Sequence, residues 1–72
     1  MSSIPILKPH KVIRALEKAG FVRKRQKGSH VQLCKLNYLV TVPLHNRDLK
    51  IKIMKSILQQ ANMTVEELKQ YL

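Results

Sequence analysis

The chain has 72 residues and a formal net charge of +10, from 14 Lys or Arg residues against 4 Asp or Glu residues. A chain of this length forms one small domain that buries only about 60% of its unfolded surface, which excludes most deep, enclosed pockets. The excess positive charge favours a phosphate backbone as the target, ahead of an acidic protein or an anionic membrane. The single cysteine, Cys34, excludes an internal disulfide, and no apolar run suits a signal peptide or a membrane span. We therefore expect a cytoplasmic protein without membrane contact.

The first predicted element is a helix over Pro9–Ala19. Proline suits the first turn of a helix, and Gly20 supplies the left-handed residue that ends one. Apolar residues at helical spacing should face the core, and these are Val12, Ile13, Leu16 and Ala19. The sequence holds no repeat or linker, so residues 1–72 are expected to form a single domain, with disorder only at residues 1–4.

Beyond Gly20 the apolar pattern changes to a period of two, which predicts an antiparallel meander. The expected strands are Phe21–Gln26, His30–Lys35 and Tyr38–Val42. The chain should reverse at Lys27-Gly28-Ser29, where Gly28 supplies the φ freedom, and again at Leu36-Asn37. Pro43 should end the last strand, because it lacks the N–H that a ladder requires.

The middle strand determines where the histidine points. Side chains alternate between the two faces of a strand, so Val31 and Leu33 share one face and His30, Gln32 and Cys34 share the other. The apolar pair should face the helices. His30 is therefore expected to face outward.

A polar loop over residues 43–49 leads to a second helix, predicted over Leu49–Gln60 with Asp48 as its cap. Its inward stripe should consist of Ile53, Met54, Ile57, Leu58 and Ala61. Asn62 can take the left-handed position that closes this helix.

Residues 64–67, Thr-Val-Glu-Glu, are typical of a capping box and predict a short last helix with Leu68 and Leu72 facing inward. The order is α-β-β-β-α, an α+β fold with a three-stranded antiparallel sheet and a short C-terminal helix. The helices should cover one face of the sheet and leave the other face open.

The candidate active site is the turn that ends on His30. Imidazole transfers protons near neutral pH, and this one is mounted on a predicted strand. Cations beside it would attract a polyanion, and these are Arg23, Lys24, Arg25 and Lys27. We interpret the segment as a nucleic-acid-directed active site, although on chemistry alone a lone histidine at the start of a strand is more often a surface or supporting residue.

The rest of the turn allows two roles for each residue. Gly28 mainly serves the reversal, but it could also let backbone amides approach a phosphate. Ser29 is either a turn hydroxyl or a phosphate donor; it is not a nucleophile, because no nearby acid completes a triad. No His, Cys, Asp or Glu residues stand at metal-ligand spacing, so we expect neither a metal nor another cofactor.

Four segments together resemble a known family, and they are Leu16–Phe21, Lys27–His30, Val40–His45 and Lys55–Ala61. In this order and spacing, over about residues 9–70, they are similar to the HicA toxin family of bacterial and archaeal toxin–antitoxin systems. The resemblance implies a fold like the double-stranded-RNA-binding domain, cleavage of mRNA that stops translation, and neutralisation by a HicB antitoxin. It also implies that His30 is the catalytic histidine. His45 falls in a family segment where it could contact RNA, assist proton transfer or be only a loop residue.

The chain departs from the usual family pattern at two places. The family usually has a Pro and a Gly where this chain has Leu49–Ile53, which includes Lys50 and Lys52. Asn62 replaces a usual Gly.

The expected chemistry is RNA cleavage without a metal. RNA carries its own nucleophile, the 2′-hydroxyl, so the enzyme need only hold the geometry and move protons. His30 would be the general base or acid, and Lys27, Arg23 or Arg25 would stabilise the charge on the phosphorus oxygens.

Two other functions remain open from the sequence. A non-catalytic module of the same fold would bind duplex RNA by its shape and 2′-hydroxyls, with His30 only a contact residue. A DNA-binding or interaction protein would use the second helix as its recognition element, with Lys50, Lys52 and Lys55 exposed.

Overall fold

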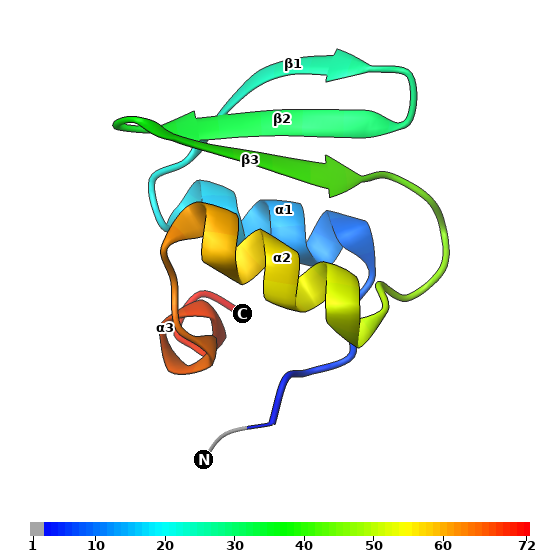
Figure 1. Ribbon diagram of the computed structural model, residues 1–72, viewed down its shortest axis with the longest axis vertical. Helices are drawn as coiled ribbons and strands as arrows, with labels where there is room; N and C mark the ends of the chain where they lie inside the picture. The colour runs from blue at the N-terminus through cyan, green and yellow to red at the C-terminus, as the bar shows by residue number, and fades with distance from the viewer. Residues whose placement is uncertain (1–2) are drawn as a thin grey trace.

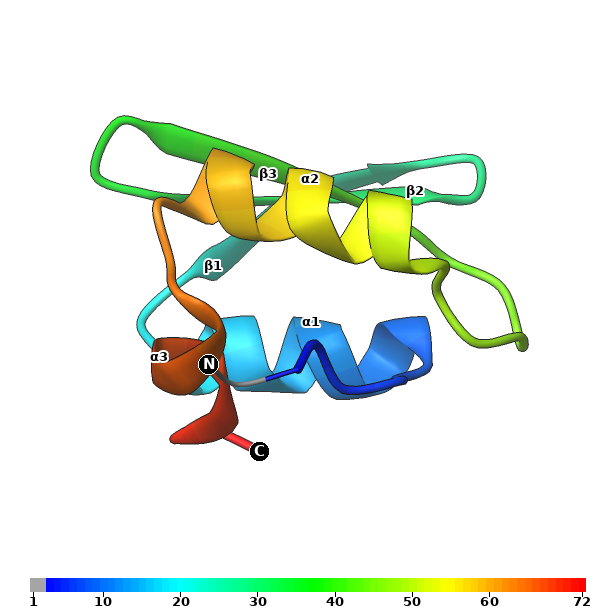
Figure 2. The ribbon, with the colours of Figure 1, turned by 60° about the horizontal axis from the view of Figure 1, so that its bottom comes forward.

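The computed structural model describes residues 3–72; Met1 and Ser2, part of the segment expected to be disordered, lie outside the described residues. Its elements are α1 (Pro9–Lys18), β1 (Val22–Lys27), β2 (His30–Lys35), β3 (Tyr38–Pro43), α2 (Ile51–Ala61) and α3 (Val65–Lys69). The strands form one antiparallel sheet in the order β1-β2-β3. Figures 1 and 2 show α1 and α2 on one side of the sheet, so the predicted α-β-β-β-α arrangement is confirmed.

The core lies between the sheet and the two long helices. Val31 pairs with Val42 and Leu33 with Val40, and none of the four side chains has any exposed surface. Direct cross-strand partners project from the same face, so β2 and β3 present one apolar face to the helices. The predicted stripe of α1 is buried as well, which confirms the face assignments for these elements. Ile4 also packs against this core, so the expected disorder does not extend to it.

Three chain reversals adopt the left-handed backbone that their residues predict. Gly20, two residues after the end of α1, has a φ of 106°, and Gly28 has a φ of 57° between β1 and β2. Asn62 closes α2 with a φ of 54° and a ψ of 49°. Asparagine tolerates this region better than most residues, which explains how it can stand where the family that the sequence resembles usually has glycine.

The start of α2 differs from the prediction. The helix begins at Ile51, its N-cap residue is Lys50, and no side chain caps it, so the expectation that Asp48 would do so was wrong. Leu49 is buried, and its N–H donates to the C=O of Leu7 at 2.8 Å. This tertiary contact ties Leu49 to the N-terminal segment, so helix formation starts two residues later than predicted.

Two residues predicted to face inward do not. Ile53 is 37% exposed and Leu72 is 50% exposed. Ile53 precedes the buried Met54 by one residue, which rotates it by about 100° around the helix axis, away from the core stripe. Leu72 follows the end of α3, whereas Leu68 within α3 is fully buried as expected.

The predicted capping box of α3 is present. The Glu67 N–H donates to Thr64 Oγ1 at 3.1 Å, and the Thr64 N–H donates to Glu67 Oε1 at 2.9 Å. Within residues 3–72, none of the helices has both the length and the apolar character needed to cross a membrane.

Candidate active site on the open face of the sheet

The open face of the sheet carries three cross-strand rows of different character. Strand pairing aligns Lys27–His30–Pro43, then Arg25–Gln32–Thr41, then Val22–Cys34–Leu39. The first row is basic and carries an imidazole, the second is polar and the third is apolar. Opposite ends of one face therefore offer different chemistry to a ligand.

His30 is the first residue of β2 and is exposed on this face. Lys27 lies directly across from it on β1, and Pro43 lies directly across on β3. The Leu44 N–H donates to the C=O of Ser29, which fixes the β3–α2 loop against the β1–β2 turn. The strand ladder and this bond hold the backbone of His30 while its side chain stays accessible to a ligand.

The four predicted cations of β1 do not share one face. Arg25 lies on the open face, where its Nε donates to Gln32 Oε1 at 3.2 Å. Arg23 pairs with the buried Leu33 and therefore lies on the helix side, where its Nε is 3.5 Å from Glu17 Oε2. Lys24 occupies the register shift between the two arginines. The structure thus brings Arg25 and Lys27, but not Arg23, to the face of His30.

His45 lies in the loop between β3 and α2 and is exposed. Its Nδ1 accepts a hydrogen bond from the Arg47 N–H at 3.2 Å. A ring nitrogen that accepts a hydrogen bond carries no proton, so the neutral imidazole holds its proton on Nε2. This bond selects the tautomer of His45 that offers Nε2–H as a donor.

A shallow groove of about 370 Å³ surrounds this loop, lined by Pro43, His45, Arg47, Asp48, Lys50 and Ile53. Pro43 also pairs with His30, so the groove adjoins the basic row of the open face. The sequence interpretation did not include Arg47 as a site residue. Its position in the polar loop, two residues after His45, is the only sequence signal that could have indicated it.

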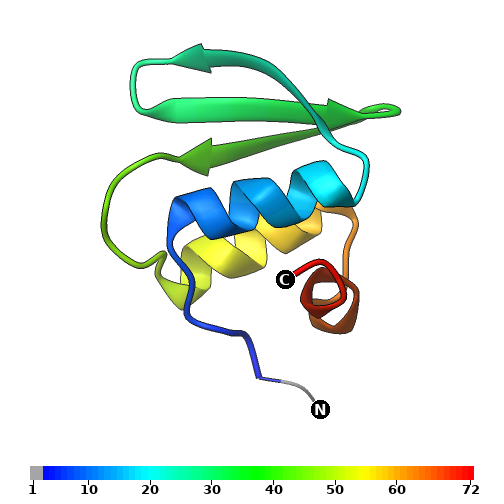
Figure 3. The ribbon, with the colours of Figure 1, turned by 180° about the vertical axis from the view of Figure 1, so that it is seen from behind.

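Figures 1 and 3 show that the β1–β2 turn, the β3–α2 loop and the start of α1 lie on the same side of the molecule. His30 and His45 come from the first two of these segments. Among residues 3–72, no group of three or more His, Cys, Asp or Glu side chains is arranged to hold a metal ion. The side chains that the His30 row and the β3–α2 loop offer to a ligand at this end include the imidazoles of His30 and His45 and the cations Lys27 and Arg47.

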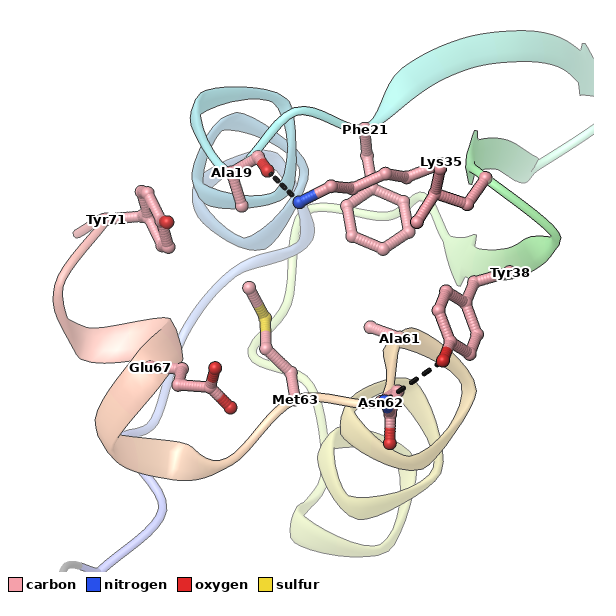
Figure 4. Close-up of a pocket in the computed structure, with 10 residues that line it drawn as sticks. Ala19, Phe21, Lys35, Tyr38, Ala61, Asn62, Met63, Glu67 and Tyr71 are labelled. Atoms are coloured by element: carbon pink, nitrogen blue, oxygen red, sulfur yellow. Dashed lines mark hydrogen bonds between the residues drawn. The ribbon is translucent and has the colours of Figure 1, made fainter.

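The opposite end holds a second hollow, of about 210 Å³ (Figure 4). Lys35 lies at its edge, but its Nζ donates to the C=O of Ala19 at 2.7 Å and sits 5.9 Å from the ring centroid of Phe21. The Asn62 amide nitrogen donates to the Tyr38 hydroxyl at 3.1 Å. Lys35 thus compensates the C-terminal carbonyls of α1, and this end serves packing rather than the candidate site.

Comparison with known proteins agrees with the resemblance seen in the sequence. Among curated proteins, no sequence matches the chain. The family model for the HicA toxin of bacterial toxin–antitoxin systems matches residues 9–63, which include every element from α1 to α2 and the whole candidate site. Because the match covers most of the 72 residues, the chain belongs to the HicA toxin family.

Proposed function

We propose that this protein is the toxin of a toxin–antitoxin pair, that it cleaves mRNA at the His30 end of the open sheet face, and that a HicB-like antitoxin restrains it. Membership in the HicA family supports the toxin role and the existence of a cognate antitoxin. The observation that carries the chemical part is the placement of His30. It is exposed on a fixed strand start, directly across from Lys27 and on the same face as Arg25.

The proposed reaction uses the RNA itself as the nucleophile. The 2′-oxygen forms a bond to the adjacent phosphorus, and the bond from phosphorus to the 5′-oxygen of the next nucleotide breaks. A base removes the proton of the 2′-hydroxyl, and an acid delivers a proton to the leaving 5′-oxygen. His30 performs one of these transfers, while Lys27 and Arg25 stabilise the negative charge that accumulates on the phosphorus oxygens.

His45 is a phosphate contact of the proposed site. With its Nδ1 accepting from the Arg47 N–H, the neutral ring presents Nε2–H as a hydrogen-bond donor to a phosphate oxygen. Arg47 and Lys50 line the same groove. We place the RNA strand along the basic row, past Gly28 and Ser29 of the turn, and into this groove.

The antitoxin is proposed to cover the same face. Restraint by a partner protein fits the exposure of His30 in the described residues. A partner with acidic residues beside Arg25 and Lys27 would compete directly with RNA. Electrostatic pairing of this kind makes association fast and sensitive to salt.

A pair of charge reversals tests the position of the site. Arg25→Glu and Arg23→Glu change the net charge equally, but only Arg25 lies on the open face. We expect Arg25→Glu to lower kcat/KM for RNA cleavage by at least about tenfold, and Arg23→Glu by only about two- to threefold, through the long-range field alone. The salt dependence of RNA binding should weaken more for Arg25→Glu.

Both variants should keep the circular dichroism spectrum of the parent, since both residues are at least partly exposed. An equal decrease in kcat/KM for the two variants would show that overall charge, rather than the open face, determines RNA binding.

A further inference from the structure

The two edges of the sheet differ in whether another part of the chain covers them. At the β3 edge, the Thr41 N–H donates to Gln60 Oε1 of α2 at 2.9 Å. Pro43, on the same edge, has no N–H to offer. Helix α2 packs against β3, as Figures 1 and 2 show. The β3 edge is therefore closed to another strand.

The β1 edge is open. All six residues of β1 are exposed, and β1 is the outer strand of the sheet. In Figures 1 and 3, no other element of the described part of the chain runs along its outer side. An exposed strand edge presents unpaired N–H and C=O groups to any strand that fits.

The alternation of the ladder identifies the groups that point outward. The Thr41 N–H points away from β2, so Gln32–Thr41 is a non-hydrogen-bonded pair and the main chain of Gln32 faces β1. Gln32 pairs with Arg25 on that side, and the next pair toward the turn is Gln26–Val31. That pair must be non-hydrogen-bonded, so the N–H and C=O of Gln26 project outward from the free edge.

The charge of β1 selects the strand that can pair there. Four of its six residues are cations, in the sequence Val-Arg-Lys-Arg-Gln-Lys. Pairing with β1 of a second copy would set these cations against one another, which is destabilising. Lysines and a register shift also protect an edge from self-association, and Lys24 supplies both. An acidic strand would instead be attracted to this edge, because its carboxylates would lie beside the cations of β1.

We propose that the cognate antitoxin adds an extended, acidic strand to the free edge of β1, hydrogen-bonded to the main chain of Gln26 and flanked by the cations of that strand. The proposal deepens the antitoxin part of the proposed function and does not depend on RNA cleavage. The added strand would lie beside Lys27, one strand away from His30, and would bring the rest of the antitoxin to the edge of the open face. RNA, in contrast, would use the side chains of this strand and not its main chain.

A substitution that changes the main chain of β1 distinguishes strand pairing by the antitoxin from side-chain contacts with RNA. Gln26→Pro removes the outward N–H without changing charge, and proline is tolerated in an edge strand where the N–H faces outward. Gln26→Ala is the matched control: it loses the same side chain, including the bond from Nε2 to the C=O of Gly28, but keeps the N–H. We expect the purified antitoxin to bind Gln26→Pro about tenfold more weakly than Gln26→Ala in calorimetry, the effect of one lost hydrogen bond at a packed interface.

RNA cleavage by the two variants should be equal, and if the protein cleaves no RNA the antitoxin comparison still decides. Equal antitoxin affinities of the two variants would overturn the proposal. Should Gln26→Pro fail to fold, amide exchange of the unmodified protein gives the answer. The Gln26 amide should exchange more slowly in the antitoxin complex than in the free protein, and an unchanged rate, or protection by RNA but not by the antitoxin, would overturn the proposal.

Discussion

Replacing His30 with alanine is expected to abolish growth arrest and mRNA loss when the protein is induced alone. Removal of a general acid or base typically costs about 10²- to 10⁴-fold in rate, enough to make a toxin harmless at ordinary expression. His30 is exposed, so the free energy of unfolding should change by no more than about 0.5 kcal/mol. Growth curves, mRNA levels and a urea unfolding curve measure these effects.

His10→Ala is the matched control, because it removes an exposed imidazole from α1 instead of β2. We expect this variant to remain fully toxic. Full toxicity of His30→Ala at equal expression would remove His30 from the mechanism.

The second large effect is expected when the 2′-hydroxyl of the RNA substrate is replaced. Replacing the 2′-hydroxyl at a cleavage position by hydrogen or methoxy removes the proposed nucleophile, so cleavage at that position should stop. The same replacement at a neighbouring nucleotide should leave cleavage in place. EDTA should have no effect, because the proposed proton transfers and charge stabilisation use only side chains.

Gel analysis of a defined RNA with single modified positions would measure this result. Cleavage of an all-deoxy strand at a comparable rate would contradict the use of the 2′-oxygen. Inhibition by EDTA would contradict the metal-independent mechanism.

Local patterns were sufficient to predict most of the fold. The strict alternation of Val31 and Leu33 with polar residues placed His30 on the open face, because a strand has no other way to bury both apolar side chains. Gly28, Asn62 and the capping box at Thr64 are likewise signals that act within a few residues. Each of these predictions is confirmed by the backbone angles, burial or hydrogen bonds.

The predictions that failed depend on contacts between distant segments. Asp48 is a good capping residue in isolation, but the hydrogen bond from Leu49 to Leu7 moves the helix start to Ile51. Ile53 fits a helical apolar pattern, but packing of the sheet selects a stripe that begins at Met54.

The parts of the candidate site that the sequence did not predict also depend on features that local patterns do not show. Spacing alone placed Arg23 and Arg25 in one cluster, and both belong to a strand that is polar from its second residue onward. No apolar residue there marks which face is inward, so the register shift at Lys24 leaves no sequence signal. The tautomer of His45 depends on a bond within a loop of irregular structure, which residue patterns do not predict.

The chemical ends of the RNA fragments test the central claim most directly. Purified protein should be incubated with a defined RNA, and the masses of the fragments should be compared with those obtained with His30→Ala. Attack by the 2′-oxygen predicts a 2′,3′-cyclic phosphate on one fragment and a 5′-hydroxyl on the other, with no fragments from His30→Ala. Intact RNA after incubation with the unmodified protein would instead indicate a non-catalytic RNA-binding module, and fragments that end in a 3′-hydroxyl would contradict the proposed mechanism.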